Sequence, residues 1–80
     1  MKSAEEMFEE LGYIKMKDHF YTINYWKGRH ETIYSHIDFD LNNKTVIAIW
    51  WDENQEIDMP TLKAINKQCE ELGWLEDDRL

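Results

Sequence analysis

Residues 32–51 carry the clearest alternation of apolar and polar positions in the chain, in two runs that flank Asn42-Asn43. The first run is typical of a half-buried β-strand, with one face formed by Ile33, Ile37, Phe39 and Leu41. The second run, residues 46–51, is apolar at every position, so both faces of that strand need cover. Asn tolerates positive φ better than most residues, which favours a two-residue turn at Asn42-Asn43 and a β-hairpin around it.

A third strand is predicted just before this hairpin. Residues 20–26 divide their side chains between two faces, with Tyr21, Ile23 and Tyr25 opposed to Phe20, Thr22, Asn24 and Trp26. Residues 27–30 follow as a turn, in which Gly28 supplies the unusual backbone angles. Residues 13–18 form a connector with room for a short extended piece through Ile14 and Met16. Three successive strands joined by short turns predict an antiparallel meander.

Two helices flank the predicted sheet, and each shows a signal for its first residue. Ser3 and Glu6 form a capping box, in which each side chain bonds the backbone N–H of the other residue. The first helix then has an apolar stripe formed by Ala4, Met7, Phe8 and Leu11. Asp58 is the N-cap of the second helix, and Pro60 is tolerated in the first turn. The buried stripe of the second helix is formed by Leu62, Ile65, Cys69 and Leu72.

Both helices are predicted to end in the same way. Each final turn reads Glu-Glu-Leu-Gly and is followed by an aromatic residue, with Gly12 before Tyr13 and Gly73 before Trp74. A glycine in the left-handed conformation stops the helix, and the next residue packs back on the last turn. We therefore expect Tyr13 to pack on Phe8, and Trp74 to make the equivalent contact on the second helix.

These elements predict an α+β fold in the order α-β-β-β-α, with a three-stranded antiparallel meander and both helices packed on one face. Residues 1–75 form a single small domain, and the acidic residues 76–80 form a frayed tail. The opposite face of the sheet is either an interface or is shielded by the connector and the tail. It carries some of Phe20, Trp26, Tyr34, His36, Ile47, Ile49 and Trp51.

The charge of the chain bears on its partners. Its 80 residues include 17 acidic and 9 basic ones, which gives a formal net charge of −8. Direct binding to nucleic acid is disfavoured, because affinity for phosphates comes from Lys and Arg. The same charge favours a protein partner with a basic surface, toward which an acidic face is able to imitate nucleic acid. The alternative is that the charge only keeps a small domain soluble.

The cysteine count and the hydropathy of the chain indicate where it works. Cys69 is the single cysteine, so an intramolecular disulfide and a zinc site built on cysteines are both excluded. Its helical position favours a small buried hydrophobe over a reactive thiol. No apolar run approaches the roughly 20 residues that span a bilayer, and the first residues show no apolar signal segment. We expect a cytoplasmic protein that does not bind membranes.

Motifs for catalysis or cofactor binding are missing from the sequence. It contains no glycine-rich phosphate loop, no zinc-protease helix motif and no nucleophile elbow, and it has three glycines in all. His36, Asp38 and Asp40 share one strand face, where His and carboxylates are able to hold a metal ion or share a proton. The sequence identifies no further ligand for them, so a solvated strand face is the favoured interpretation. We predict no enzyme activity, no cofactor and no metal site.

Candidate interface residues come from the uncovered sheet face and from the acidic loop that follows it. Trp50 and Trp51 place one indole on each face of the last strand. The outward indole is either an anchor for a partner or a residue buried under the loop or tail. The predicted interface set is Trp26, Tyr34, His36, Trp51, Asp52, Glu53 and Glu56.

Two segments, EEMFEELGY at residues 5–13 and LKAINKQCEELGW at residues 62–74, resemble small uncharacterised proteins encoded by phages and prophages of Gram-positive bacteria. The resemblance covers the two helices, whereas the strands match in pattern only. It implies a phage setting, in which many small acidic proteins inhibit host defence or host enzymes, but it transfers no functional residues. The element order and the charge also look like one class of anti-CRISPR inhibitor that imitates DNA. This likeness is in topology and charge without matching motifs, and is therefore an analogy.

The sequence thus predicts a non-enzymatic acidic phage protein that binds and modulates a host protein, as an anti-defence or nucleic-acid-mimicking inhibitor. The alternative is a homodimeric accessory domain that associates through the open sheet face.

Overall fold

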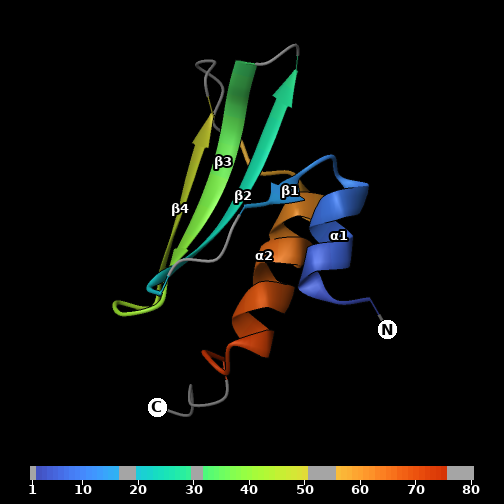
Figure 1. Cartoon of the computed structure of the whole chain (residues 1–80). Coiled ribbons are helices and arrows are strands. Elements are labelled where there is room, and N and C mark those ends of the chain that lie inside the picture. Colours follow the sequence, from blue (N-terminus) through green and yellow to red (C-terminus); the bar gives the residue numbers. More distant parts are fainter. Residues whose placement is uncertain (1, 17–19, 30–31, 51–55, 76–80) are drawn as a thin grey trace.

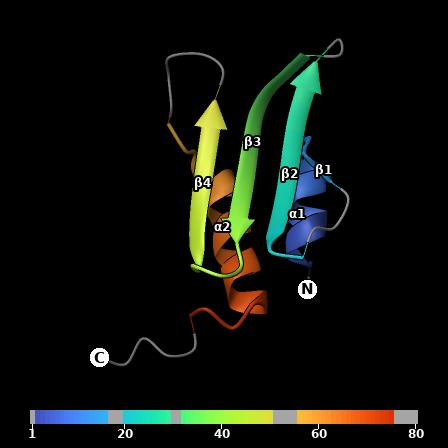
Figure 2. The same ribbon diagram turned by 60° about the vertical axis from the view of Figure 1, so that its left-hand side comes forward.

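The computed structural model describes residues 2–16, 20–29, 32–50 and 56–75, and for residues 29, 32–34 and 50 it describes the backbone only. The two helices lie side by side on one face of the sheet (Figure 1, Figure 2). This arrangement confirms the predicted α+β class, while the predicted tail at residues 76–80 lies outside the described residues. The elements in chain order are α1 (Ala4–Glu10), β1 (Ile14–Lys15), β2 (Thr22–Arg29), β3 (Thr32–Asp40), β4 (Thr45–Trp50) and α2 (Met59–Glu71).

Within the described residues the sheet has four antiparallel strands in the order β1-β2-β3-β4. The additional strand is β1, which lies in the predicted connector and pairs Ile14 with Trp26 and Lys15 with Tyr25. The prediction of three strands is therefore wrong in number. Two residues are too few to leave a periodic pattern in the sequence, and it is the pairing with β2 that makes this piece a strand.

β2 extends further than the sequence predicts. Gly28 pairs with Ile33 and Arg29 pairs with Thr32, so the predicted turn at residues 27–30 is wrong over residues 27–29. Residue 30 lies outside the described part of the chain. The register shifts between Lys27 and Gly28, which marks an irregularity of the β-bulge type. A single glycine inside a strand commonly marks such a bulge, and this is the role of Gly28 here.

The turn between β3 and β4 is wider than the predicted two-residue turn. Asp40 pairs with Thr45, which leaves residues 41–44 as a four-residue turn. The positive φ of 57° belongs to Lys44 and not to an asparagine. The Asp40 carboxylate accepts hydrogen bonds from the backbone N–H groups of Asn42 and Asn43, at 2.9 and 3.0 Å. These side-chain bonds satisfy backbone donors that face no strand, and they stabilise the wider turn.

Both predicted helix starts are confirmed. Ser3 Oγ accepts from the Glu6 N–H at 3.1 Å, and Glu6 Oε1 accepts from the Ser3 N–H at 2.8 Å. Asp58 is the N-cap of α2, and its side chain accepts a backbone N–H three residues further on. One contact was not predicted: the Ala4 N–H donates to Glu71 Oε2 at 2.8 Å. It places a carboxylate at the positive end of α1 and ties the start of α1 to the end of α2.

The predicted helix ends are confirmed as well. Gly12 and Gly73 have φ values of 95° and 78°. At the end of α1, the Tyr13 N–H donates to the Phe8 carbonyl at 2.9 Å, and the two rings meet edge to face with centroids 5.6 Å apart. At the end of α2, the N–H of Trp74 makes the equivalent bond at 3.0 Å. Both ends are Schellman motifs, each with a buried or half-buried aromatic residue behind its glycine.

Replacing Gly12 or Gly73 with alanine is expected to lower the free energy of unfolding by about 1 kcal/mol, because alanine is disfavoured at positive φ. A Cβ at Gly12 would lie 3.2 Å from Lys27 Cε, the end of a flexible side chain that is able to move aside, so we expect losses of similar size at the two positions. Urea unfolding followed by circular dichroism measures both changes. Gly28→Ala is the comparison variant, because Gly28 has no positive φ and alanine there meets none of this backbone strain. Equal midpoints for all three variants and the wild type would contradict the prediction.

The core lies between the sheet and the helices and is centred on an aromatic group. The ring of Phe8 stacks on that of Tyr25 with centroids 4.0 Å apart, and the rings of Tyr13 and Phe39 meet Phe8 edge on. The buried Tyr13 hydroxyl forms a hydrogen bond of 2.7 Å with Ser35 Oγ. The buried apolar residues are Ala4, Phe8, Tyr13, Tyr25, Ile37, Phe39, Ala64, Ile65 and Cys69.

The buried stripe of α2 is rotated relative to the prediction. Leu62, predicted to be buried, is 36% exposed, whereas Gln68 is 6% exposed. Gln68 faces the sheet because its Oε1 accepts a hydrogen bond of 2.6 Å from the Tyr25 hydroxyl. Ile65 and Cys69 are buried as predicted. Burial also raises the pKa of the Cys69 thiol, which fits a small hydrophobe and not a reactive group.

Candidate functional site

The face of the sheet turned away from the helices is the candidate functional site. Residues that pair directly across antiparallel strands share a face, so the register defines which side chains belong to it. Neither helix lies on this side of the sheet (Figure 1, Figure 2). We call it the open face, and its described side chains are those of Ile14, Thr22, Asn24, Trp26, His36, Asp38, Asp40, Thr45, Ile47 and Ile49.

One end of the open face is apolar. Ile14, Trp26, His36 and Ile49 stand in register across the strands and form a single row. The rings of Trp26 and His36 lie 6.4 Å apart. Ile14 is 67% exposed and Ile49 is 42% exposed, and Ile47 in the adjacent row is 53% exposed. Three exposed isoleucines beside a half-buried tryptophan form an apolar patch of the kind that marks interaction sites.

The prediction that both faces of the last strand need cover is met on one side of β4. Val46 and Ala48 pack against the core beneath the helices. Ile47 and Ile49, on the open face, stay exposed among the described residues. The two faces of this apolar strand therefore have different environments. One face packs beneath the helices, and the other lies on the open face.

The other end of the open face is acidic. Asp38 Oδ2 lies 2.8 Å from His36 Nδ1, and both side chains are about a third exposed. Asp40 lies one row further on, where its oxygens accept the hydrogen bonds of the four-residue turn. In the part of the chain that the structure describes, no three His, Cys, Asp or Glu side chains are placed to hold a metal ion. His36, Asp38 and Asp40 occupy successive rows of the open face, and the first two are hydrogen-bonded to each other.

Asp40 gives the site an acid-sensitive turn. The backbone hydrogen bond from Asn43, assisted by its side chain and by the backbone of Asn42, holds the pKa of Asp40 below its ordinary value of 3.8. Because the pKa is lower in the folded state, this carboxylate stabilises the fold above pH 3.8 and loses that effect as the pH falls through the folded-state pKa. The carboxylate therefore stays charged at neutral pH.

Replacing Asn43 with alanine is expected to raise the pKa of Asp40, since the variant loses the side-chain bond of 3.0 Å and keeps the backbone bond. Carbon-detected NMR titration of the Asp40 carboxyl measures this pKa directly. Asn42→Ala is the matched control, because Asn42 bonds Asp40 through its backbone N–H. A titration curve that is the same for Asn43→Ala and the wild type would contradict the assignment.

The predicted interface residues are only partly brought together. Trp26 and His36 lie on the open face, side by side. Glu56 is exposed in the segment that leads into α2 and belongs to no strand. Phe20, predicted on the same face, precedes β2 and is 92% exposed. The Tyr34 side chain and the whole of Trp51, Asp52 and Glu53 lie outside the described residues, as do the side chains that would decide between Trp50 and Trp51.

Ile14 is a site residue that is missing both from the predicted interface set and from the predicted uncovered face. It is the most exposed of the open-face isoleucines, and it extends the apolar row to the edge strand β1. The short apolar alternation of Ile14 and Met16 is the one signal in the sequence that points to it. That signal is too brief to fix a strand or a face without the pairing partner.

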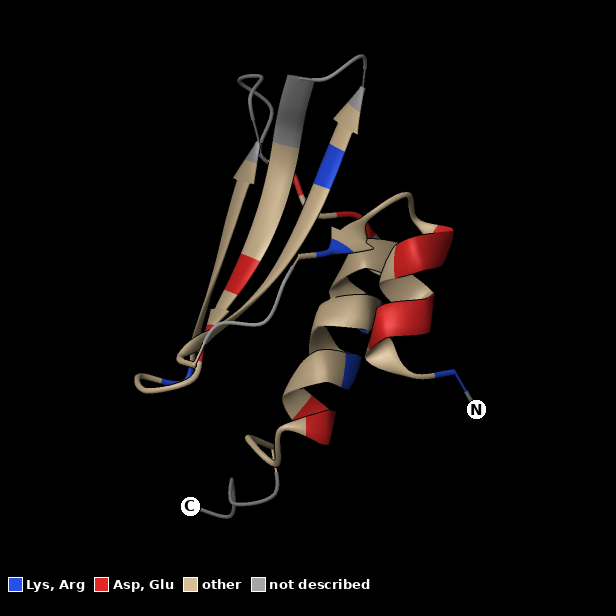
Figure 3. Ribbon diagram, viewed as in Figure 1, with Lys and Arg blue, Asp and Glu red and all other residues tan. Residues whose placement is uncertain are grey.

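Described acidic residues lie on both sides of the sheet. Figure 3 shows them along α1, in the segment that leads into α2 and at the end of α2, and also on β3. On α1 they include the first-turn residues Glu5 and Glu6, while Asp38 and Asp40 lie on β3. The helix-side carboxylates are separated from the apolar row by the whole thickness of the sheet. On the open face, the acidic residues Asp38 and Asp40 therefore adjoin the apolar row.

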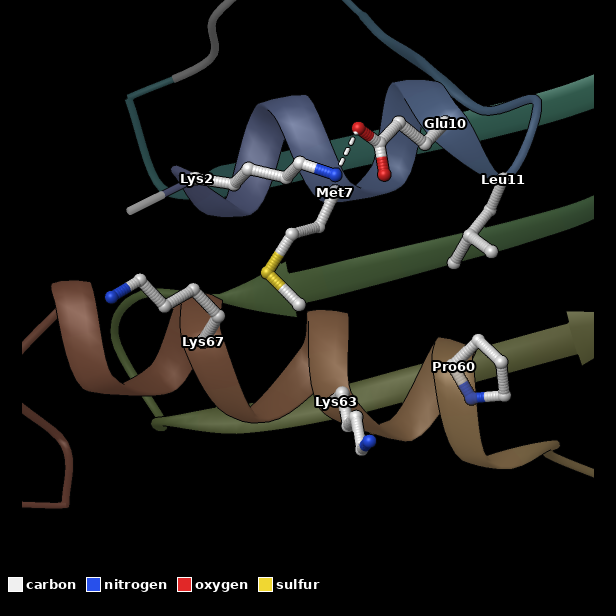
Figure 4. Close-up of a pocket in the computed structure, with 7 residues that line it drawn as sticks. All are labelled: Lys2, Met7, Glu10, Leu11, Pro60, Lys63 and Lys67. Carbon is white, nitrogen blue, oxygen red and sulfur yellow. Dashed lines mark ion pairs between the residues drawn. The ribbon is translucent and has the colours of Figure 1, made fainter.

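A groove of about 440 Å³ lies between the two helices, on the side away from the sheet. Figure 4 shows Met7, Leu11 and Pro60 in it, and it is also lined by Lys2, Glu10, Lys63 and Lys67. Lys2 pairs with Glu10, and Lys67 pairs with Glu70 at 3.0 Å. Its polar groups are flexible side chains at the surface, so the groove offers no fixed polar group to orient a ligand.

Comparison of the chain with protein-family models, with curated protein sequences and with solved structures found no significant match. Among the described residues, no helix has both the length and the apolar character needed to cross a membrane.

Proposed function

We propose that this protein is a non-enzymatic binding module that docks a protein partner on the open face of its sheet. The supporting observation is the exposed apolar row next to Asp38 on the same face. Such a patch loses water when a partner covers it, which provides the driving force, and Trp26 has the chemistry of an interface anchor. Small-molecule catalysis has no comparable support: the groove between the helices offers no fixed polar group, and no three His, Cys, Asp or Glu side chains among the described residues are placed to hold a metal ion.

The charge on the open face favours a partner with a basic group over a second copy of the chain. The described open face holds the carboxylates of Asp38 and Asp40 and no Lys or Arg. Face-to-face association of two copies would bring four carboxylates together with no Lys or Arg between them, and burying like charges is costly. A partner with Lys or Arg beside an apolar contact would pair with them instead.

A phage setting rests on the resemblance of the helix segments to phage proteins. In that setting the partner is a host protein in the host cytoplasm, and docking modulates it, as in an anti-defence inhibitor. The acidic residues of the open face then occupy a basic site on the partner that otherwise holds nucleic acid. The formal net charge of −8 supports this choice of partner.

Ile49→Lys is expected to reduce recovery of the partner at least tenfold in a low-salt pull-down from a Gram-positive host lysate. The substitution adds a like charge opposite a basic partner and removes an apolar contact. Leu62→Lys is the matched control, since Leu62 is also exposed but lies on α2. Circular dichroism checks that both variants fold.

Equal recovery with Ile49→Lys and Leu62→Lys, or no partner at all, would contradict the proposed docking face. Light scattering during size exclusion addresses the homodimer alternative. We expect a monomer, and a dimer that Ile49→Lys dissociates would favour self-association through the open face.

A further inference from the structure

β4 forms one edge of the sheet. In the described part of the chain it pairs with β3 on one side and with no strand on the other (Figure 2). Along an edge strand, alternate backbone N–H and C=O groups point away from the sheet. β4 therefore presents a set of backbone donors and acceptors directly beside Ile47 and Ile49 of the open face.

This edge lacks the features that normally protect an edge strand. Natural edges are blocked by charged residues, by Pro or by a bulge. From Thr45 to Trp50 the strand reads TVIAIW, with neither a charge nor a proline. Its pairing with β3 runs without a register shift, and the bulge of this sheet lies between β2 and β3. β4 is therefore able to accept another strand.

The register specifies which side chains an added strand would meet on the open face. It would lie next to Ile49, Ile47 and Thr45, whose rows continue into β3 as His36, Asp38 and Asp40 respectively. The first two positions are exposed isoleucines, which favour apolar neighbours. At the third position the small Thr45 separates the added strand from the Asp40 carboxylate.

A long basic side chain is able to bridge that separation. Strands lie about 4.8 Å apart, so the added strand lies roughly 10 Å from β3. Arg reaches across such a distance by laying its stem over the intervening residue, and its guanidinium pairs well with a carboxylate. A chain of net charge −8 adds a general attraction for a basic segment.

We propose that the partner docks by adding an antiparallel strand to β4, and that this strand carries the pattern apolar-x-apolar-x-Arg or Lys toward the open face. This inference rests on the proposed function and specifies the kind of partner segment. It combines main-chain pairing at the edge, which gives affinity, with side-chain pairing on the face, which gives specificity. A second copy fits less well, because the open-face positions of β4 itself are Thr45, Ile47 and Ile49 and include no cation.

The probe is a capped heptapeptide, Thr-Val-Thr-Val-Thr-Arg-Thr, titrated into the full 80-residue chain and followed by the backbone amide signals in NMR. We expect saturable shifts that are largest in residues 45–50. Exchanging the peptide arginine for glutamate should weaken binding at least tenfold, because the carboxylates of the open face then repel it.

Two N-methylated peptides test the main-chain pairing and control for each other. One is methylated at alternate amides, and the other at the remaining amides, with identical side chains. In an added strand only one set of amides faces β4, so one peptide should lose at least tenfold in affinity while the other binds like the parent. Equal binding of both methylated peptides would overturn strand addition and leave docking on the open face intact.

The remaining outcomes are also decisive. If none of the peptides binds while Ile49→Lys still loses the partner, strand addition of this pattern is wrong and the proposed function stands. If the chain associates with itself through β4, as shown by concentration-dependent shifts of residues 45–50 without peptide, the occupant is a second copy and the inference is overturned.

Discussion

Phe8→Ala is expected to lower the free energy of unfolding by about 3–5 kcal/mol, the range for removing a fully buried phenylalanine. Phe8 is 0% exposed, and it contacts the rings of Tyr25, Tyr13 and Phe39 from the middle of the core. At about 0.05–0.15 kcal/mol per residue, a domain of 80 residues has roughly 4–12 kcal/mol in total. The substitution therefore removes a large share of the stability.

Chemical denaturation and thermal melting both measure this loss. Because 1 kcal/mol shifts the melting temperature of a domain this small by about 4–8 °C, we expect a decrease of at least about 12 °C. Phe20→Ala is the matched control, since Phe20 is 92% exposed and should change the stability by no more than about 0.5 kcal/mol. Similar losses for Phe8→Ala and Phe20→Ala would show that the core is not organised around Phe8.

Gln68→Met is expected to lower the free energy of unfolding by about 1–3 kcal/mol, because it leaves a buried hydroxyl without a partner. The Tyr25 hydroxyl donates to Gln68 Oε1 at 2.6 Å, and Tyr25 and Gln68 are 1% and 6% exposed. Tyr25→Phe should lower the free energy of unfolding by a similar amount, since it leaves the buried Gln68 carbonyl without a hydrogen-bond donor. Methionine keeps the shape of glutamine, so the cost reports the lost hydrogen bond and not a cavity.

The double variant Tyr25→Phe, Gln68→Met tests whether these costs share one origin. With both polar partners removed, neither buried group is left unpaired, and the loss should be smaller than the sum of the two single losses. Urea denaturation of the wild type, the two single variants and the double variant measures the free energies of unfolding that this comparison needs. Strictly additive losses would mean that the bond is not the reason why α2 turns its polar Gln68 toward the sheet.

Helix boundaries were predictable because their causes are local. The capping box of Ser3 and Glu6 and the glycine stops at Gly12 and Gly73 involve residues that are at most five positions apart. Each signal works through a backbone conformation or hydrogen bond that the short segment forms by itself. The α+β class follows from the same kind of local pattern. Strands show apolar residues at every second position, whereas helices show them at spacings of three and four, so the two are distinguishable in the sequence.

Three of the errors lie where a distant partner decides the local structure. The two residues of β1 become a strand only by pairing with β2. Residues 27–29 have turn composition, but pairing with β3 holds them in a strand. Leu62 and Gln68 exchange their expected environments because the orientation of α2 depends on where the Tyr25 hydroxyl lies.

The candidate site also combines features that the sequence predicts with features that only the structure shows. Alternation along β2 and β3 was enough to place Trp26 and His36 on the uncovered face, because a strand sends successive side chains to opposite sides. The register across the strands was needed to align them with Ile14 and Ile49 in one row. It also placed Asp38 beside Ile47, which creates the boundary between the apolar and acidic ends.

The sequence by itself determined the helices, the strand faces, the charge and the fact that two helices cover only one side of the sheet. These properties depend on periodicity and composition, which one chain segment carries alone. The tertiary structure decided the strand number, the register, the orientation of α2 and the exposed edge at β4, because each requires two segments far apart in the chain to meet. The open face thus has its composition from local pattern and its arrangement from long-range pairing.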